Sequence, residues 1–132
     1  MRNIFAAIFM LILGGMVTPA LAETWDCTFK ISSGSDAGIS GKSRIEVSGG
    51  VLDWLLPPPP GGKDWSKVSY KVVENNNAGI VSISSRSQID PQAGPVVGAS
   101  IVALSKTGGN LRLGSITVQG VDDGLGGRCR KR

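Results

Sequence analysis

The residues that could do chemistry in this chain are few. Its 132 residues include no His, so the commonest general base and the commonest metal ligand are both missing. Gly41-Lys42-Ser43 looks like the end of a phosphate-binding loop, but that motif requires a glycine five positions earlier, where Asp36 stands. Ser105 and Lys106 are strand neighbours with side chains on opposite faces, which makes them poor catalytic partners. We therefore expect no catalytic residues and no enzyme.

Carboxylates offer no clearer site. Asp53 could pair with Glu46 or Glu74, but nothing in the sequence places these groups at the separation that glycoside hydrolysis requires. Asp122-Asp123-Gly124 suggests a calcium loop, yet the EF-hand spacing and its final glutamate are absent, and the same residues are typical of a turn. The sequence therefore predicts no metal site and no cofactor.

The C-terminal tail is the strongest charge feature, with Arg128, Arg130, Lys131 and Arg132. Of the 14 basic residues, Arg2 precedes the cleavage site predicted below and four form the tail, which leaves 9 against 10 acidic residues. This balance predicts a basic tail on a body without a basic surface, and we expect no nucleic-acid binding. Two interpretations stay open: a solubilising end, or a weak electrostatic contact with an anionic surface such as lipid or lipopolysaccharide.

Aromatic residues beside a proline run form a second candidate binding feature. Trp54 and Trp65 flank Pro57–Pro60, and aromatic residues on loops are frequent in protein–protein contacts. The alternative is that both indole rings cap the open end of a β-barrel. Tyr70 completes the candidate partner-binding residues.

The N-terminal segment predicts export. An apolar run from Ile4 to Val17 follows one positive charge, and Ala20-Leu21-Ala22 supplies an A-x-A cleavage pattern. The run has 14 residues, fewer than the about 20 that a membrane-spanning helix needs. We expect a signal peptide over residues 1–22, a single domain over residues 23–132 with no transmembrane segment after cleavage, and a periplasmic or secreted protein.

Both cysteines, Cys27 and Cys129, lie in the predicted mature chain, one near each end. In an oxidising compartment two such thiols are expected to pair. A metal-binding thiol pair is the competing interpretation, but the chain has neither His nor a C-x-x-C spacing to support it. We therefore predict one structural disulfide that encloses almost the whole domain.

Period-two alternation dominates the predicted mature chain. From Thr24 to Ile31, every second residue is apolar, which is the pattern of a strand with one buried face. Similar segments predict seven strands, with a short eighth strand as an option at Arg128–Arg132. Since a Cys27–Cys129 bond would bring the first and last strands together, we expect an all-β fold: a small antiparallel barrel or sandwich of about 7–8 strands, closed by one disulfide. Loops are predicted at Ser32–Gly41, Pro57–Lys67, Gln88–Pro95 and Gly120–Gly127.

Two resemblances to known proteins support this prediction. Trp25-Asp26-Cys27-Thr28-Phe29 and a lone Cys129 near the end resemble small exported proteobacterial proteins that begin W-x-C-x-[FY]. Their late Lys-Thr-Gly-like hairpin is matched by Lys106-Thr107-Gly108, and the resemblance implies a periplasmic β protein without implying an activity. More loosely, the chain resembles the periplasmic inhibitors of c-type lysozyme, small β-barrels with an early and a late Cys. Those inhibitors use a Ser-containing loop and a Tyr-containing motif, and Tyr70 is the only Tyr here.

Three functions are therefore compatible with the sequence. The first is a non-catalytic periplasmic or secreted binding module whose loops contact a protein or another component of the cell envelope. The second is a carrier that holds a small apolar ligand inside the barrel. The third is a protein similar to the lysozyme inhibitors.

Overall fold

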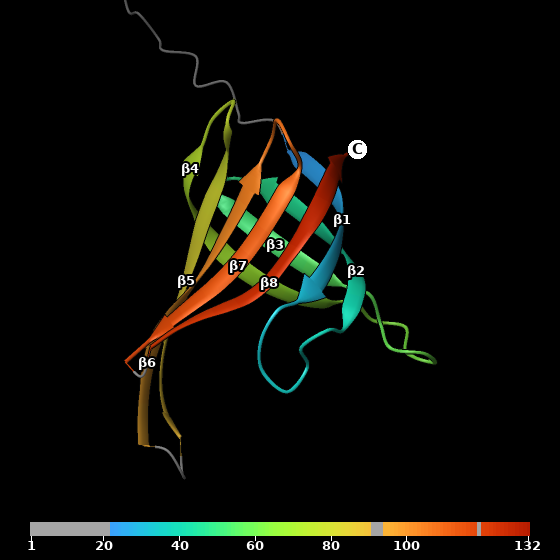
Figure 1. The fold of residues 1–132 in the computed structure, drawn as a ribbon. Coiled ribbons are helices and arrows are strands. Elements are labelled where there is room, and N and C mark those ends of the chain that lie inside the picture. The colour runs from blue at the N-terminus through green and yellow to red at the C-terminus, as the bar shows by residue number, and fades with distance from the viewer. Residues whose placement is uncertain (1–21, 91–93, 119) are drawn as a thin grey trace, which may run out of the picture.

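Apolar and polar residues alternate along the chain, and in the computed structural model each alternating segment forms a strand. The structure describes residues 22–90, 94–118 and 120–132, with side chains left aside at 86–90, 94–96, 122 and 123. Each strand pairs with the next in antiparallel fashion, and β8 pairs with β1, so the sheet closes into a barrel (Figure 1). The strands are β1 (Glu23–Ile31), β2 (Ser40–Ser48), β3 (Val51–Leu56), β4 (Ser66–Asn75), β5 (Gly79–Asp90), β6 (Gly94–Ser105), β7 (Asn110–Thr117) and β8 (Gly120–Lys131).

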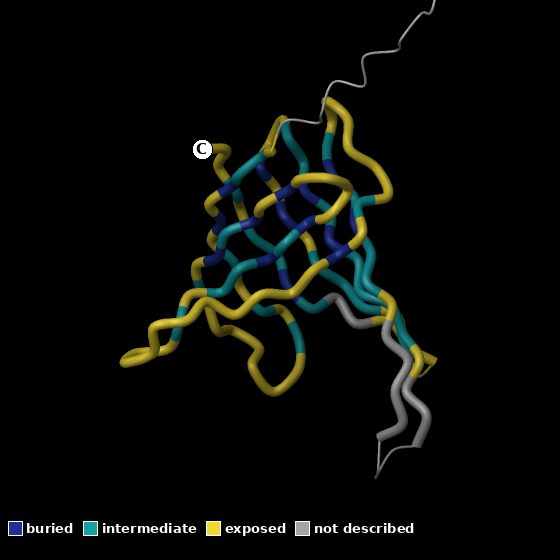
Figure 2. Tube along the Cα trace, turned by 180° about the vertical axis from the view of Figure 1, so that it is seen from behind, coloured by how far each residue is buried: buried dark blue, intermediate teal, exposed yellow. Residues whose placement is uncertain are grey.

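The apolar set of each strand faces the barrel interior. In Figure 2 the buried positions alternate with exposed ones along the strands of the barrel body. One interior row crosses three neighbouring strands, because Trp25 lies opposite Ile45 and Ile45 lies opposite Trp54. The buried apolar residues are Trp25, Cys27, Ile45, Val47, Leu52, Trp54, Tyr70, Ile80, Val102, Leu104, Leu111 and Leu125. An eight-stranded barrel has an interior just wide enough for such side chains to fill.

The seam between β1 and β8 carries the predicted disulfide. Cys27 lies directly opposite Cys129, and their sulfur atoms are bonded across a sequence separation of 102 residues. Both the barrel and its disulfide closure are thus confirmed. The predicted signal peptide lies outside the described residues except for Ala22.

Two glycines make room for an aromatic ring inside the barrel. Phe29 lies between Gly41 on β2 and Gly127 on β8. A Cβ atom at Gly41 would approach the Phe29 ring to 2.6 Å, and one at Gly127 would overlap the carbonyl oxygen of Thr28. Gly41 thus leaves space for the Phe29 ring, which packs edge-on against Trp54 with ring centroids 6.2 Å apart, and Gly127 lets the backbone of β8 approach β1 closely.

Two of the predicted loops are wrong. In the loop predicted at Gln88–Pro95, both flanks continue the β5–β6 ladder, since Gln88 pairs with Val96 and Asp90 with Gly94, while residues 91–93 lie outside the described residues. The whole segment predicted at Gly120–Gly127 belongs to the long strand β8. The many glycines of this segment are typical of a loop. At Gly127, however, glycine is required because β1 approaches too closely to leave space for a side chain. Figure 1 shows β5 and β6 extending past the rest of the barrel as a twisted ribbon.

The other two loops are shorter than predicted. Strand β2 already begins at Ser40, two residues before its predicted start at Lys42. Strand β4 begins at Ser66, so the proline-led excursion occupies residues 57–65. In both places polar residues precede the alternating pattern and still pair with the neighbouring strand, which composition does not reveal.

Candidate functional site

Strand β8 turns the predicted tail into part of the barrel wall. Thr28 of β1 lies opposite Arg128, and Asp26 lies opposite Arg130. Both arginines are exposed, because they alternate with the inward-facing Cys129. The last basic residues of the chain are therefore held in a fixed register against β1.

Basic side chains from three further strands join these arginines on the outer surface. Lys42 lies opposite Thr28 on the other side of β1, and Arg44 lies opposite Asp26. The exposed ends of β1 and β7 add Lys30 and Arg112. We call this outer surface the basic face; its members are Lys30, Lys42, Arg44, Arg112, Arg128 and Arg130. The prediction of a basic tail on a body without a basic surface is thus wrong, because strand pairing gathers body lysines and arginines beside the tail.

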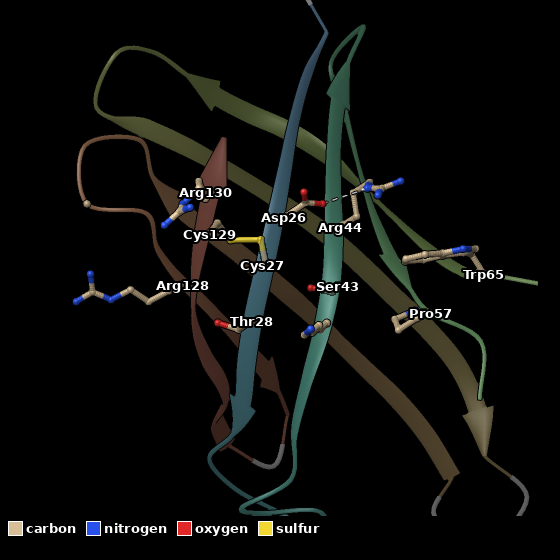
Figure 3. A pocket seen from close by; sticks show the side chains of 12 residues that line it. Asp26, Cys27, Thr28, Ser43, Arg44, Pro57, Trp65, Arg128, Cys129 and Arg130 are labelled. Carbon is tan, nitrogen blue, oxygen red and sulfur yellow. Dashed lines mark hydrogen bonds and ion pairs between the residues drawn. A yellow bond between two sulfur atoms is a disulfide. The ribbon is translucent and has the colours of Figure 1, made fainter. Parts of the chain in front are cut away.

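A groove of about 720 Å³ lies on the basic face, over β1 and between β8 and β2. In Figure 3, Arg128 and Arg130 stand on the β8 side, while Arg44, Trp65 and Pro57 stand on the β2 side. Thr28, exposed on β1, lies between the two sides and forms a neutral floor. Among the described residues that line the groove, four are basic and only Asp26 is acidic. Its volume is in the range of small-molecule sites.

Asp26 is neutralised by the arginines beside it. Arg132 donates a hydrogen bond of 2.8 Å to Asp26 Oδ2, and Arg44 donates one of 3.3 Å to Oδ1. The hydrogen bond from Arg132 and, after it, the one from Arg44 hold the pKa of Asp26 below its ordinary value. Within the described ranges, Lys42, Arg128 and Arg130 form no ion pair. The groove therefore keeps uncompensated positive charge on both sides.

The structure separates the aromatic residues that the sequence groups together. Trp65 is 47% exposed, and the Arg44 guanidinium lies 5.4 Å from its ring centroid, so it belongs to the groove wall. Trp54 and Tyr70 are only 4% and 7% exposed and belong to the interior core. Of the three predicted partner-binding aromatics, Trp65 alone offers a large surface to a partner.

The remaining basic residues of the tail are engaged in ion pairs. Lys131 lies at the barrel end beside Trp25, with its ammonium 3.6 Å from a carboxylate oxygen of Glu23. Lys106 donates a hydrogen bond of 2.8 Å to the same oxygen. Burial raises the pKa of Glu23, but the hydrogen bond and charge of Lys106, together with the charge of Lys131, outweigh it and hold the pKa below its ordinary value. This cluster of Glu23, Lys106 and Lys131 stabilises the end of the barrel. Lys131 is therefore not one of the cations that line the groove.

The basic face contains residues that sequence reasoning missed. Lys30, Arg44 and Arg112 were not singled out, and Lys42 was considered only as the end of a phosphate-binding loop, because none of the four has a charged residue directly beside it in the sequence. For the β8 side of the groove, the sequence did contain a signal. If Cys27 pairs with Cys129 between antiparallel strands, counting one residue along each strand places Arg128 opposite Thr28 and Arg130 opposite Asp26. The register between β1 and β2 depends on the loop between them, which is shorter than predicted, so the β2 side of the groove could not be derived from the sequence.

Neither a metal-binding cluster among the described residues nor a known relative assigns a role to the basic face. In the part of the chain that the structure describes, no group of three His, Cys, Asp or Glu residues is arranged to hold a metal ion. The same residues contain no helix with the length and apolar character needed to cross a membrane. No protein-family model, curated protein or solved structure matches the chain. The resemblances to small exported proteobacterial proteins and to lysozyme inhibitors therefore stay predictions.

Proposed function

We propose that the protein is a non-catalytic binding module, exported to the periplasm or beyond, that contacts an anionic component of the cell envelope through its basic face. One observation carries the proposal: Arg128, Arg130 and Lys42 line a groove on the outer wall without an ion-pair partner among the described residues. Uncompensated cations around a groove attract anions and raise their local concentration. A merely solubilising tail does not require a fixed register or a groove.

The arrangement of the core favours this outer surface over the barrel interior as the binding site. Ile45, Leu52, Ile80, Leu104 and Leu111 are fully buried inside the barrel, and Trp54 and Phe29 pack edge to face. The groove, by contrast, lies on the outside of β1, β2 and β8. The proposal therefore rests on strand side chains of the wall, with Trp65 and Pro57 as the contribution of the proline-rich loop.

Co-sedimentation with lipid vesicles tests the proposal. The native, oxidised protein should bind vesicles that contain phosphatidylglycerol and not vesicles of phosphatidylcholine alone, and added salt should release it, since salt screens exposed charges. The double variant Arg128→Gln/Arg130→Gln should lose most of this binding. Lys71→Gln, which removes an exposed cation from β4 outside the groove, is the matched control and should bind like the native protein.

Equal binding to both kinds of vesicle would contradict the proposal. So would a loss of binding free energy in the double variant that is no more than twice the loss in Lys71→Gln, because the double variant removes two charges and the effect would then follow net charge and not the groove. The unfolding temperature of each variant, measured in the same buffer, shows whether the barrel is intact.

A further inference from the structure

The groove has two cationic edges separated by an uncharged floor. Arg128 and Arg130 form one edge on β8, and Lys42 and Arg44 form the other on β2 (Figure 3). Strand β1 lies between them and presents Thr28. Because neighbouring strands lie about 4.8 Å apart, the two edges are separated by about 10 Å at the backbone. A ligand with two separated anionic groups can therefore pair with both edges while the side chains of each edge stay extended.

The two edges also differ in character. The β8 edge carries two guanidinium groups, which match phosphate oxygens with paired hydrogen bonds. The β2 edge combines Lys42 with Arg44, whose guanidinium lies over the Trp65 ring beside Pro57. This edge therefore offers an apolar wall next to a charge. Trp65 is still 47% exposed beside that guanidinium, and the C–H groups of a sugar that bears an anionic group can pack on the exposed part of its ring.

From these features we infer that the groove takes a diphosphorylated disaccharide, the headgroup of an envelope glycolipid, with one phosphate at each basic edge and a sugar ring against Trp65. A disaccharide supplies a rigid polar spacer between two phosphates and fits within about 720 Å³. Thr28 on the floor can donate or accept a hydrogen bond to a sugar hydroxyl. Asp26 does not repel this ligand, because Arg132 and Arg44 already bind its carboxylate.

The inference rests on the proposed function and adds the ligand class to it. Isothermal titration calorimetry on the native, oxidised protein tests it with three soluble probes: a glucosamine disaccharide with a phosphate on each sugar, the same disaccharide with one phosphate, and inorganic pyrophosphate. The diphosphorylated disaccharide should bind about tenfold more tightly than the monophosphorylated one, the loss expected for one charge-assisted contact. It should also bind more tightly than pyrophosphate, whose two phosphates lie closer together than the two edges and which offers no sugar ring to Trp65.

Variants assign each part of the ligand to its edge. Arg128→Gln/Arg130→Gln should remove the preference for two phosphates, so that both disaccharides bind alike. Trp65→Ala should weaken the binding of both disaccharides and leave pyrophosphate binding unchanged. Lys71→Gln should leave all three affinities unchanged.

The outcomes separate this inference from the proposed function. Equal affinity for the two disaccharides, or pyrophosphate binding as tight as that of the diphosphorylated disaccharide, overturns the inference while binding to anionic vesicles persists. A preference for two phosphates that survives in Arg128→Gln/Arg130→Gln overturns the placement in this groove. Loss of both disaccharide and vesicle binding in the native protein overturns the inference and the proposed function together.

Discussion

Reducing the disulfide is expected to destabilise the barrel without opening it in native conditions. Cys27 and Cys129 close a loop with a sequence separation of 102 residues. For a loop of this length the chain-entropy relation gives a contribution of about 4.7 kcal/mol, because the cross-link restricts the unfolded chain. In the folded state β1 and β8 still pair through seven residue positions, so the barrel retains its seam. The effect therefore belongs mainly to the unfolded state.

Urea denaturation of three forms of the protein measures this contribution. The oxidised and the reduced native chain differ only in the cross-link, whereas Cys27→Ala/Cys129→Ala also removes the two sulfur atoms from the core. We expect the reduced chain to lose about 4–5 kcal/mol of unfolding free energy, with a larger m-value because its unfolded state exposes more surface. The alanine variant should lose about 1 kcal/mol more through lost packing. In a thermal scan the reduction should lower the melting temperature by about 20 °C.

A loss below about 1 kcal/mol on reduction would refute this reasoning. It would show that the unfolded chain gains little freedom when the link opens. The β1–β8 hydrogen bonds would then provide nearly all of the closure.

Further substitutions and a pH series test the barrel and its ends. Trp54→Ala should cost about 3–5 kcal/mol in urea unfolding because the ring is buried, whereas Trp65→Ala should cost less than about 1 kcal/mol. Gly127→Ala should cost about 1–3 kcal/mol by overpacking against β1, while Gly126→Ala, whose Cβ meets only side-chain atoms at 3.7 Å or more, should be near neutral; matching losses would contradict the close approach of the strands. The pKa of Glu23 lies below its ordinary value of 4.5, so its ion pair stabilises the fold fully above that pH and is lost as the pH falls through the lowered pKa. Carboxyl titration by NMR checks this, and a pKa at or above 4.5 would contradict it.

The fold was predictable because its main signals are local or covalent. Alternation from Trp25 to Ile31 identifies a half-buried strand, and the Cys27–Cys129 pair joins the first strand to the last. The full length of β8 could not be predicted, because its glycines are typical of a loop. At Gly127 the glycine is required instead by close contact with β1. Composition alone does not distinguish these two uses of glycine.

The candidate site was only half predictable. Arg128 and Arg130 stand out as a cluster in the sequence, but Lys42 and Arg44 become their neighbours only through the pairing of β1 with β2. Conversely, Trp54 is close to the prolines in sequence and yet faces the interior, because it shares a strand face with Leu52. Counting charges along the sequence therefore does not reveal the basic face, because the pairing register of β1, β2 and β8 is what brings its residues together.

The central claim is that the outer wall of β1, β2 and β8 binds an anionic envelope component, and backbone amide NMR tests it most directly. On titration of isotope-labelled native protein with the disaccharide that carries two phosphates, amide shifts should change around Thr28, Lys42, Arg44, Arg128 and Arg130, with little change in β4 and β5. Shift changes confined to the far side of the barrel or to its interior residues, or none at saturating ligand, would contradict the account.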